Sequence, residues 1–144
     1  IGWNSRLDTL QAAILGVKLT AFEKNELKDV NEVARKYTEN LENIVKTPRV
    51  KEGFYSSWAQ YTIQLKSQEE RDELLGYLKE NGIPSMIYYP KPMHLQTAFK
   101  EIKRYVDCSV SEELCQKVLA LPMHPYMNNE DLEKVCNCVK SFFN

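Results

Sequence analysis

The first third of the chain carries apolar side chains at three- and four-residue intervals. The series runs through Leu7, Leu10, Ile14 and Val17, and continues with Leu27, Val30, Ala34, Tyr37, Leu41 and Ile44. Because this spacing places side chains on one face of an α-helix, it predicts one long helix or two helices in line. Ser5 and Asp8 stand at the spacing of a capping box, which predicts that the helix begins near the start of the chain. Pro48 and Gly53 are expected to end it.

Beyond this region the pattern changes to a strand and then a second helix. Residues 59–65 alternate apolar and polar side chains, which is typical of a strand with one buried face. Residues 69–80 return to helical spacing, and Asn81 with Gly82 favours a left-handed end to that helix. The side chains expected to face inward are Leu74, Leu75 and Leu78.

The remaining pattern predicts a second strand, a further helix, a short strand and a terminal helix. Residues 83–89, "IPSMIYY", predict the strand, which Pro90 and Pro92 would end because proline has no N–H for a ladder. The other expected elements are a helix capped by Ser109 or Ser111 and running through Val118, a strand at "LALP", and a helix that begins at Asn129 with Leu132, Val135, Val139 and Phe142 inward. Strands separated by helices after a long helix predict an α/β (α+β) fold, a compact sandwich with a small sheet.

Composition narrows the class of protein. The 144 residues are 43% apolar and 27% charged with a net charge of -1, which is typical of one soluble globular domain and argues against a nucleic-acid partner. No apolar run approaches the length of a membrane span, and no secretory signal is recognisable. The four cysteines match no zinc pattern, so we expect no metal site, and reduced thiols in a cytoplasmic protein. These thiols are expected to be buried or half-buried.

Two polar clusters stand out as candidate binding sites. In "GWNSR", residues 2–6, amide, hydroxyl and guanidinium groups gather at a helix start, which suits an anion. The alternative is helix capping with an ion pair from Arg6 to Asp8 or to a neighbouring residue. In "YYPKPMHLQ", residues 88–96, two phenols, a lysine, a histidine and an amide share a turn stiffened by prolines. Such a turn is typical of a binding surface, unless the tyrosines fill the core and the prolines merely turn the chain.

These clusters, in this order, carry a resemblance to a known family. "GWNSRLDTLQAAIL", "WAQYTI", "GIPSMIYYPKPMHLQTAF" and "LALPMHPYM" resemble four ordered blocks in the carboxyl-terminal part of the DegT/DnrJ/EryC1/StrS family of pyridoxal-phosphate-dependent nucleotide-sugar aminotransferases. The likeness covers essentially all of the chain. It implies the small carboxyl-terminal domain of a fold-type-I enzyme, with an interdomain helix region at residues 1–45 and a small α/β subdomain at residues 46–144.

The resemblance also implies roles for particular residues. Asn4 would reach the cofactor phosphate of the partner subunit across a homodimer interface, and Arg6 would face the partner's sugar site or hold its loop by an ion pair. Tyr88, Tyr89 and His94 would lie near the substrate sugar. Position 88 is often histidine in the family, so a role that requires imidazole is not carried over to Tyr88. His124 is expected only to order the turn between the flanking prolines.

The lysine that forms the Schiff base in the family lies upstream of the first block. We therefore expect no catalytic residue in this chain, an inactive fragment when it stands alone, and a start at residue 1 just before the interdomain helix. Lys18 is expected on a solvated helix face, where nothing lowers its pKa for imine chemistry.

The whole protein would use pyridoxal 5'-phosphate to transfer an amino group from an amino acid, glutamate being the expected donor, to a nucleotide-linked keto sugar. Two alternatives stay open: a pyridoxal-phosphate-dependent sugar dehydratase of the same family, and a non-enzymatic dimerisation or binding module.

Overall fold

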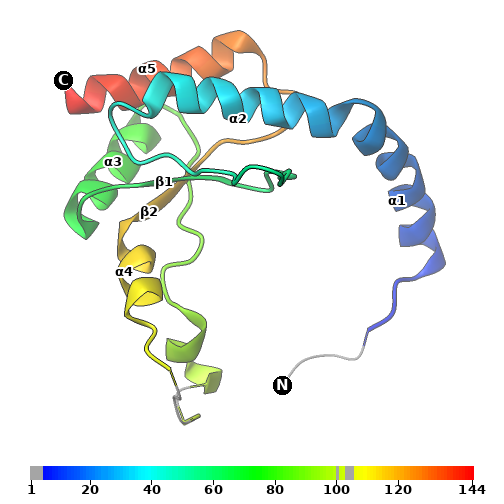
Figure 1. The fold of residues 1–144 in the computed structure, drawn as a ribbon, viewed down its shortest axis with the longest axis horizontal. Helices are drawn as coiled ribbons and strands as arrows, with labels where there is room; N and C mark the ends of the chain where they lie inside the picture. Colours follow the sequence, from blue (N-terminus) through cyan, green and yellow to red (C-terminus); the bar gives the residue numbers. More distant parts are fainter. Residues whose placement is uncertain (1–4, 100, 103–105) are drawn as a thin grey trace.

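The computed structural model describes residues 5–99, 101–102 and 106–144. Its centre is a two-stranded antiparallel sheet of β1 (Tyr61–Gln64) and β2 (Val118–Leu121), in which Ile63 pairs with Leu119. Three helices cover this sheet: α2 (Leu27–Leu41), α3 (Gln68–Glu80) and α5 (Asn129–Phe143). Figure 1 shows α2 and α5 side by side along the top of the molecule, with α3 beneath them. A shorter helix, α4 (Ser109–Lys117), leads directly into β2. The α/β (α+β) expectation, a long helical region followed by a small sheet packed with helices, is therefore confirmed.

One hydrophobic core joins these elements. Burial of apolar side chains is the main favourable contribution to folding, so the position of this core defines the folded unit. The hydroxyl of the buried Tyr37 donates a hydrogen bond to the carbonyl oxygen of Pro122, 2.9 Å away. Tyr61 is also buried in this core, and burial raises the pKa of its hydroxyl to about 12. The largest fully buried side chains are Tyr37, Tyr61, Leu41, Ile63, Leu74, Leu78, Leu119, Val139 and Cys136.

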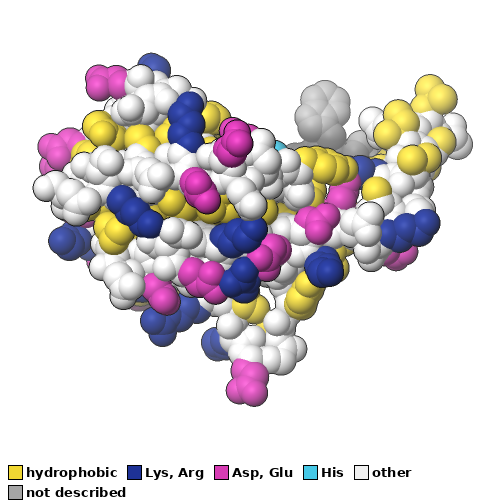
Figure 2. All heavy atoms as spheres, turned by 90° about the horizontal axis from the view of Figure 1, so that it is seen from above, with side chains coloured by type: hydrophobic (Ala, Val, Ile, Leu, Met, Phe, Trp, Pro, Cys, Tyr) yellow, Lys and Arg dark blue, Asp and Glu magenta, His cyan; other side chains and the backbone are white. Residues whose placement is uncertain are grey.

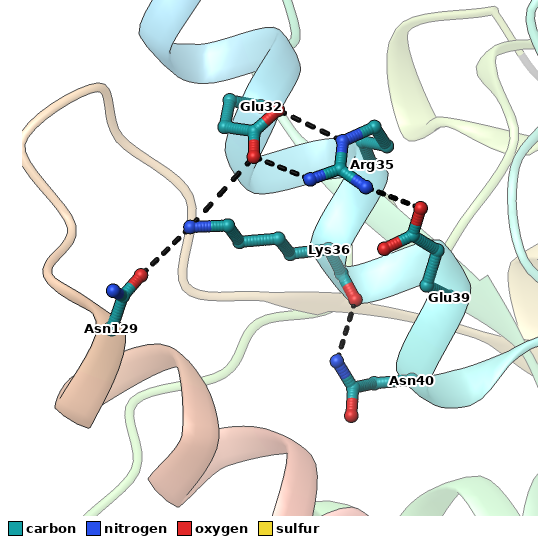
Figure 3. Close-up of polar contacts among 6 residues, drawn as sticks. All are labelled: Glu32, Arg35, Lys36, Glu39, Asn40 and Asn129. Carbon is teal, nitrogen blue, oxygen red and sulfur yellow. Dashed lines mark hydrogen bonds and ion pairs between the residues drawn. The ribbon is translucent and has the colours of Figure 1, made fainter.

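A polar network on the outer face of α2 helps to hold it against α5 (Figure 3). Arg35 lies between Glu32 and Glu39 and donates to both, at 2.9 Å from its Nε to Glu32. The Lys36 ammonium donates to Asn129 Oδ1 at the start of α5, at 2.8 Å. The Arg35 pairs lie within α2, and the Lys36–Asn129 contact joins α2 to α5. Because these groups are on the surface, the network contributes little to stability.

The first helix, α1 (Thr9–Ala21), lies outside this core. Asp8 caps it by accepting a hydrogen bond from the Gln11 backbone N–H at 2.8 Å, so the prediction of a Ser5 cap is wrong. A π-helical turn, Phe22–Glu26, joins α1 to α2, and the helical axis bends there, so that α1 swings away from the sheet (Figure 1). The two helices are therefore continuous but not in line.

No residue of α1 is buried. The predicted apolar face is exposed along its length, with Leu10 at 79% and Val17 at 77%, and Leu15 and Leu19 on the opposite side are exposed as well. Figure 2 shows the apolar side chains of this end of the molecule at the right of the view. A helix that is apolar around most of its circumference is normally buried between two surfaces.

The predicted strand at residues 83–89 is wrong. Only Met86 bridges to Ala120 of β2, through two backbone hydrogen bonds of 3.1 and 2.8 Å. Pro84 has no N–H to donate to a ladder. Ile83 is buried in the core without being paired in the sheet.

Some of the predicted helix ends are confirmed by the structure and others are wrong. Ser67 caps α3 through the Glu70 N–H, Gly82 has the left-handed φ of 70° expected after it, and α5 begins at Asn129 as predicted. Neither Ser109 nor Ser111 caps α4; Asp107 accepts from the Ser109 N–H and hydroxyl instead. Of the three leucines expected to face inward in α3, Leu74 and Leu78 are fully buried and Leu75 is half-buried.

The cysteines behave as small core and near-core side chains. All four are free thiols; Cys136 is buried and the others are half-buried, as expected. Burial raises the pKa of the Cys136 thiol to about 11. Within the described part of the chain, no group of His, Cys, Asp and Glu could hold a metal ion. Over the same residues, no helix combines the length and apolar composition needed to cross a membrane.

Candidate functional site

The candidate binding loop, residues 88–96, leaves the sheet edge just after the Met86 bridge. Tyr88 and Tyr89 project outward, at 40% and 65% exposure, with their rings edge to face and their centroids 5.7 Å apart. The peptide bond between them is cis. The alternative in which these tyrosines fill the core is therefore wrong, and their hydroxyls are available to a ligand.

His94 lies on a 3₁₀ turn, Met93–Leu95, in the same loop. Its Nε2 is 2.8 Å from Oε1 of Glu112, in the first turn of α4. The His94 side chain is 19% exposed, so one part of the ring is covered and another meets solvent. Three of the predicted residues, Tyr88, Tyr89 and His94, thus lie on one loop, with the two tyrosine rings in contact.

A pocket of about 250 Å³ opens beside Tyr88. Its walls come from the residues before β1, from residues 84–88 and from the end of β2. Gln60 contributes an amide to its lining, and Ser85, which also lines it, has a buried hydroxyl without a hydrogen-bond partner among the described residues. The loop therefore borders a hollow with polar groups as well as aromatic ones.

The other predicted cluster stands apart from this loop. Asn4 lies outside the described residues. Arg6 is exposed and has no ion-pair partner among the residues that the structure describes, so the alternative of an ion pair from Arg6 to Asp8 or another described neighbour is not seen. The Asp8 side chain accepts a hydrogen bond from the Gln11 N–H. The N–H groups of Thr9 and Leu10, in the first turn of the helix, have no partner within the helix. In Figure 1 this start of α1 is separated from the loop by open space.

A third cluster, formed by Lys18, Glu26 and Tyr126, was missed by the sequence analysis. The Lys18 ammonium is 2.5 Å from Glu26 Oε1 and 3.1 Å from the Tyr126 hydroxyl, which also donates to Glu26. Glu26 is 5% exposed although it is a carboxylate. The sequence signal was its position four residues before Val30, on the apolar stripe of α2. The cluster connects the π-helical turn with the segment between β2 and α5.

The charges of this cluster reinforce one another. The hydrogen bond from Lys18, followed by that from Tyr126, lowers the pKa of Glu26 below its ordinary value of 4.5. The hydrogen bond to Glu26 raises the pKa of Lys18 above 10.5. Lys18 is therefore a cation held in an ion pair, which is the opposite of the neutral amine that imine chemistry requires.

We predict a pH dependence of stability from this ion pair. The lowered pKa of Glu26 means that its contribution is present above pH 4.5 and is lost as the pH falls through the folded value. The raised pKa of Lys18 means that its contribution is present below pH 10.5 and is lost as the pH rises further. Glu26→Gln removes the charge and keeps the shape, so it should lower the melting temperature near pH 7 and have a smaller effect near pH 3.

Thermal unfolding followed by circular dichroism at several pH values measures this difference. Glu23→Gln, an exposed carboxylate in the same π-helical turn, is the matched control and should leave the melting temperature unchanged at both pH values. A Glu26→Gln effect of equal size in acid and at neutral pH would show that the charge of Glu26 is not the source of stability.

Known proteins resemble the whole chain. The model of the DegT/DnrJ/EryC1/StrS aminotransferase family matches residues 1–140. "Pleiotropic regulatory protein" of Geobacillus stearothermophilus is 36% identical over 99% of this chain and 39% of its own length. UDP-2-acetamido-2-deoxy-3-oxo-D-glucuronate aminotransferase of Pseudomonas aeruginosa is 36% identical over 94% of this chain and 36% of its own.

A solved structure shows the same fold. The crystal structure of a DegT DnrJ EryC1 StrS aminotransferase from Brucella abortus matches with a TM-score of 0.90 at 44% identity, and the match covers 100% of this chain and 38% of that one. The chain thus spans about two-fifths of the length of these relatives.

Proposed function

The chain belongs to the DegT/DnrJ/EryC1/StrS aminotransferase family, and on that premise we propose that it is the carboxyl-terminal part of a pyridoxal-phosphate-dependent nucleotide-sugar aminotransferase. The whole protein transfers an amino group, with glutamate as donor, to a nucleotide-linked keto sugar. The observation that carries this proposal is the likeness of the entire chain to a family aminotransferase of known structure at 44% identity. The relative from Pseudomonas aeruginosa, named for a UDP-linked 3-oxo sugar, supports the substrate class.

The exposed helix α1 supports the proposal that this domain works beside a larger one. Apolar surface that water would otherwise contact is normally covered by a partner. A mainly apolar pocket of about 540 Å³ lies along one side of α1 and reaches the π-helical turn, with Leu15, Leu19 and Phe22 among its lining residues. Since α2 shares its core with the sheet, we place the interdomain contact on α1 and keep α2 with the small domain.

The start of α1 fits the phosphate of the cofactor. Two backbone N–H groups without intrahelical partners, and the guanidinium of Arg6, which has no ion-pair partner among the described residues, offer donors and positive charge to an anion. Asn4, directly before them in sequence, would bind the phosphate bound to the partner subunit of a homodimer. Pyridoxal phosphate would supply the electron sink for the amino transfer.

The loop of residues 88–96 would form one wall of the sugar pocket. Tyr88 and Tyr89 present hydroxyls that can both donate and accept, which suits the hydroxyl groups of a sugar. Their exposed rings present flat apolar faces, and His94 supplies a ring nitrogen. None of these groups needs to exchange a covalent bond with the substrate, so the role of this loop is binding and orientation.

In the whole protein, Tyr89→Ala is expected to raise KM for the nucleotide sugar about tenfold, because a hydrogen bond and a ring contact are lost together. Tyr89→Phe should raise it less. The assay follows amino transfer from glutamate to a UDP-linked 3-oxo sugar. Tyr55→Ala is the matched control, since Tyr55 is 67% exposed, close to the 65% of Tyr89, but lies in another loop.

A Tyr89 variant that leaves KM unchanged would show that this loop is not part of the sugar site. An unsubstituted protein that transfers no amino group to any keto sugar would overturn the proposed function.

A further inference from the structure

The binding loop, residues 88–96, is attached to the rest of the domain at both ends. Just before the loop, the Met86–Ala120 bridge joins the chain to β2. Near the end of the loop, His94 Nε2 lies 2.8 Å from Glu112 Oε1 of α4. These two residues are 18 positions apart in sequence, so the contact is tertiary.

The other hydrogen bonds that the structure describes within this loop join residues at most five positions apart in sequence. The Leu95 N–H donates to the Pro92 carbonyl at 3.0 Å, the Gln96 N–H to that of Met93 at 3.1 Å, and the Gln96 side-chain amide to that of Lys91 at 3.0 Å. These bonds fix the internal shape of the turn. They do not reach α4, whereas the His94–Glu112 contact joins the turn to that helix.

The contact also selects the tautomer of His94. An ionised carboxylate can only accept a hydrogen bond, so the hydrogen must be on Nε2. In the neutral ring, Nδ1 is then the nitrogen with a free lone pair, which can accept a hydrogen bond from a ligand hydroxyl. A carboxylate that fixes ring orientation and tautomer is the usual way in which proteins prepare a histidine for a specific role.

We propose that Glu112 is a positioning residue of the sugar site: it holds His94 in the Nε2–H tautomer and keeps the Tyr88–Gln96 loop against α4. The assignment of the loop to a sugar rests on the proposed function, while the positioning itself does not. The neighbouring Glu113 has a different task, because it pairs with Lys117 one turn along the same helix, at 2.6 Å. This difference provides a matched control on adjacent residues of α4.

The first test measures backbone hydrogen exchange in the whole protein. Glu112→Ala should accelerate exchange in the peptide that covers residues 93–99 by about tenfold, as expected when a charge-assisted hydrogen bond is lost. Glu112→Gln keeps the size and an acceptor oxygen, so it should restore most of the protection. Glu113→Ala should leave this peptide unchanged. Unchanged exchange in Glu112→Ala would overturn the proposal, as would equal acceleration in Glu113→Ala.

The second test separates positioning from general loss of structure. Nitrogen NMR of ¹⁵N-histidine-labelled protein should show the Nε2–H tautomer for His94 and its loss in Glu112→Ala, with His94→Ala identifying the signal. In kinetics, Glu112→Ala should raise KM for the nucleotide sugar about tenfold and leave kcat within about twofold, the pattern of lost ground-state binding. The double variant with His94→Ala should be no worse than His94→Ala alone. An Nδ1–H tautomer or additive effects would overturn the proposal.

The two tests distinguish failure of this inference from failure of the proposed function. If the unsubstituted protein transfers no amino group, the proposed function is wrong, and hydrogen exchange and the tautomer still decide the role of Glu112. If transfer occurs but exchange and tautomer do not respond to Glu112→Ala, the positioning role is wrong and the function stands.

Discussion

Leu119→Ala is expected to lower the free energy of unfolding of this chain by about 2–5 kcal/mol, because it leaves a cavity in a close-packed core. Leu119 is fully buried at the centre of β2, opposite Ile63. Leu10→Ala is the matched control on α1. With Leu10 at 79% exposure, the same substitution should change the free energy of unfolding by less than about 0.5 kcal/mol. Urea unfolding of the chain, at concentrations low enough to limit association through α1, measures both values.

The same pair of substitutions tests the interdomain role of α1. In the whole protein, Leu119→Ala should lower the free energy of unfolding by about the same amount as in the chain alone. Leu10→Ala should then lower it by about 2–5 kcal/mol as well, because the Leu10 side chain is buried there. A Leu10→Ala variant that remains neutral in the whole protein would show that this face of α1 stays in water. A neutral Leu119→Ala variant would contradict the core described here.

Local rules predicted most helices and failed where the answer depended on distant parts of the molecule. The spacing of Leu7, Leu10 and Ile14 correctly predicted a helix, but periodicity records which side chains share a face and not what covers that face. In α2 this face is buried in the core, whereas no residue of α1 is buried. The difference follows from the π-helical turn at Phe22–Glu26, which the sequence gives no simple rule to place.

The strand and cap errors have local physical causes. The sequence of residues 83–89 predicts a strand, yet Pro84 removes one donor, and among these residues only Met86 pairs with β2. Ser5 and Asp8 have the spacing of a capping box, which predicts Ser5 as the cap, but the side chain that accepts a backbone N–H at the start of α1 is that of Asp8.

The sequence allowed the residues of the candidate loop to be listed, but not the contacts that they make. Tyr88, Tyr89 and His94 share one short, proline-bounded loop, so their proximity follows from the sequence. Glu112 could not be paired with His94 in advance, because it lies on another element and the last third of the chain holds six other acidic residues: Glu101, Asp107, Glu113, Glu130, Asp131 and Glu133. The Glu26–Tyr126 contact, 100 residues apart in sequence, is hidden for the same reason.

The most direct test of the central claim is to locate the lysine that carries the cofactor. The whole protein that contains this chain is incubated with pyridoxal 5'-phosphate, reduced with borohydride, digested and analysed by peptide mass spectrometry. We predict a pyridoxyl-lysine outside residues 1–144, because the proposed function puts the Schiff-base lysine in the part of the enzyme that this chain does not span, and because Lys18 is held as an ammonium by Glu26. The chain treated alone should give no specific adduct. Bound cofactor without an adduct would favour a sugar dehydratase, absence of bound cofactor would favour a non-enzymatic module, and a specific adduct on a lysine of this chain would contradict the division of roles proposed here.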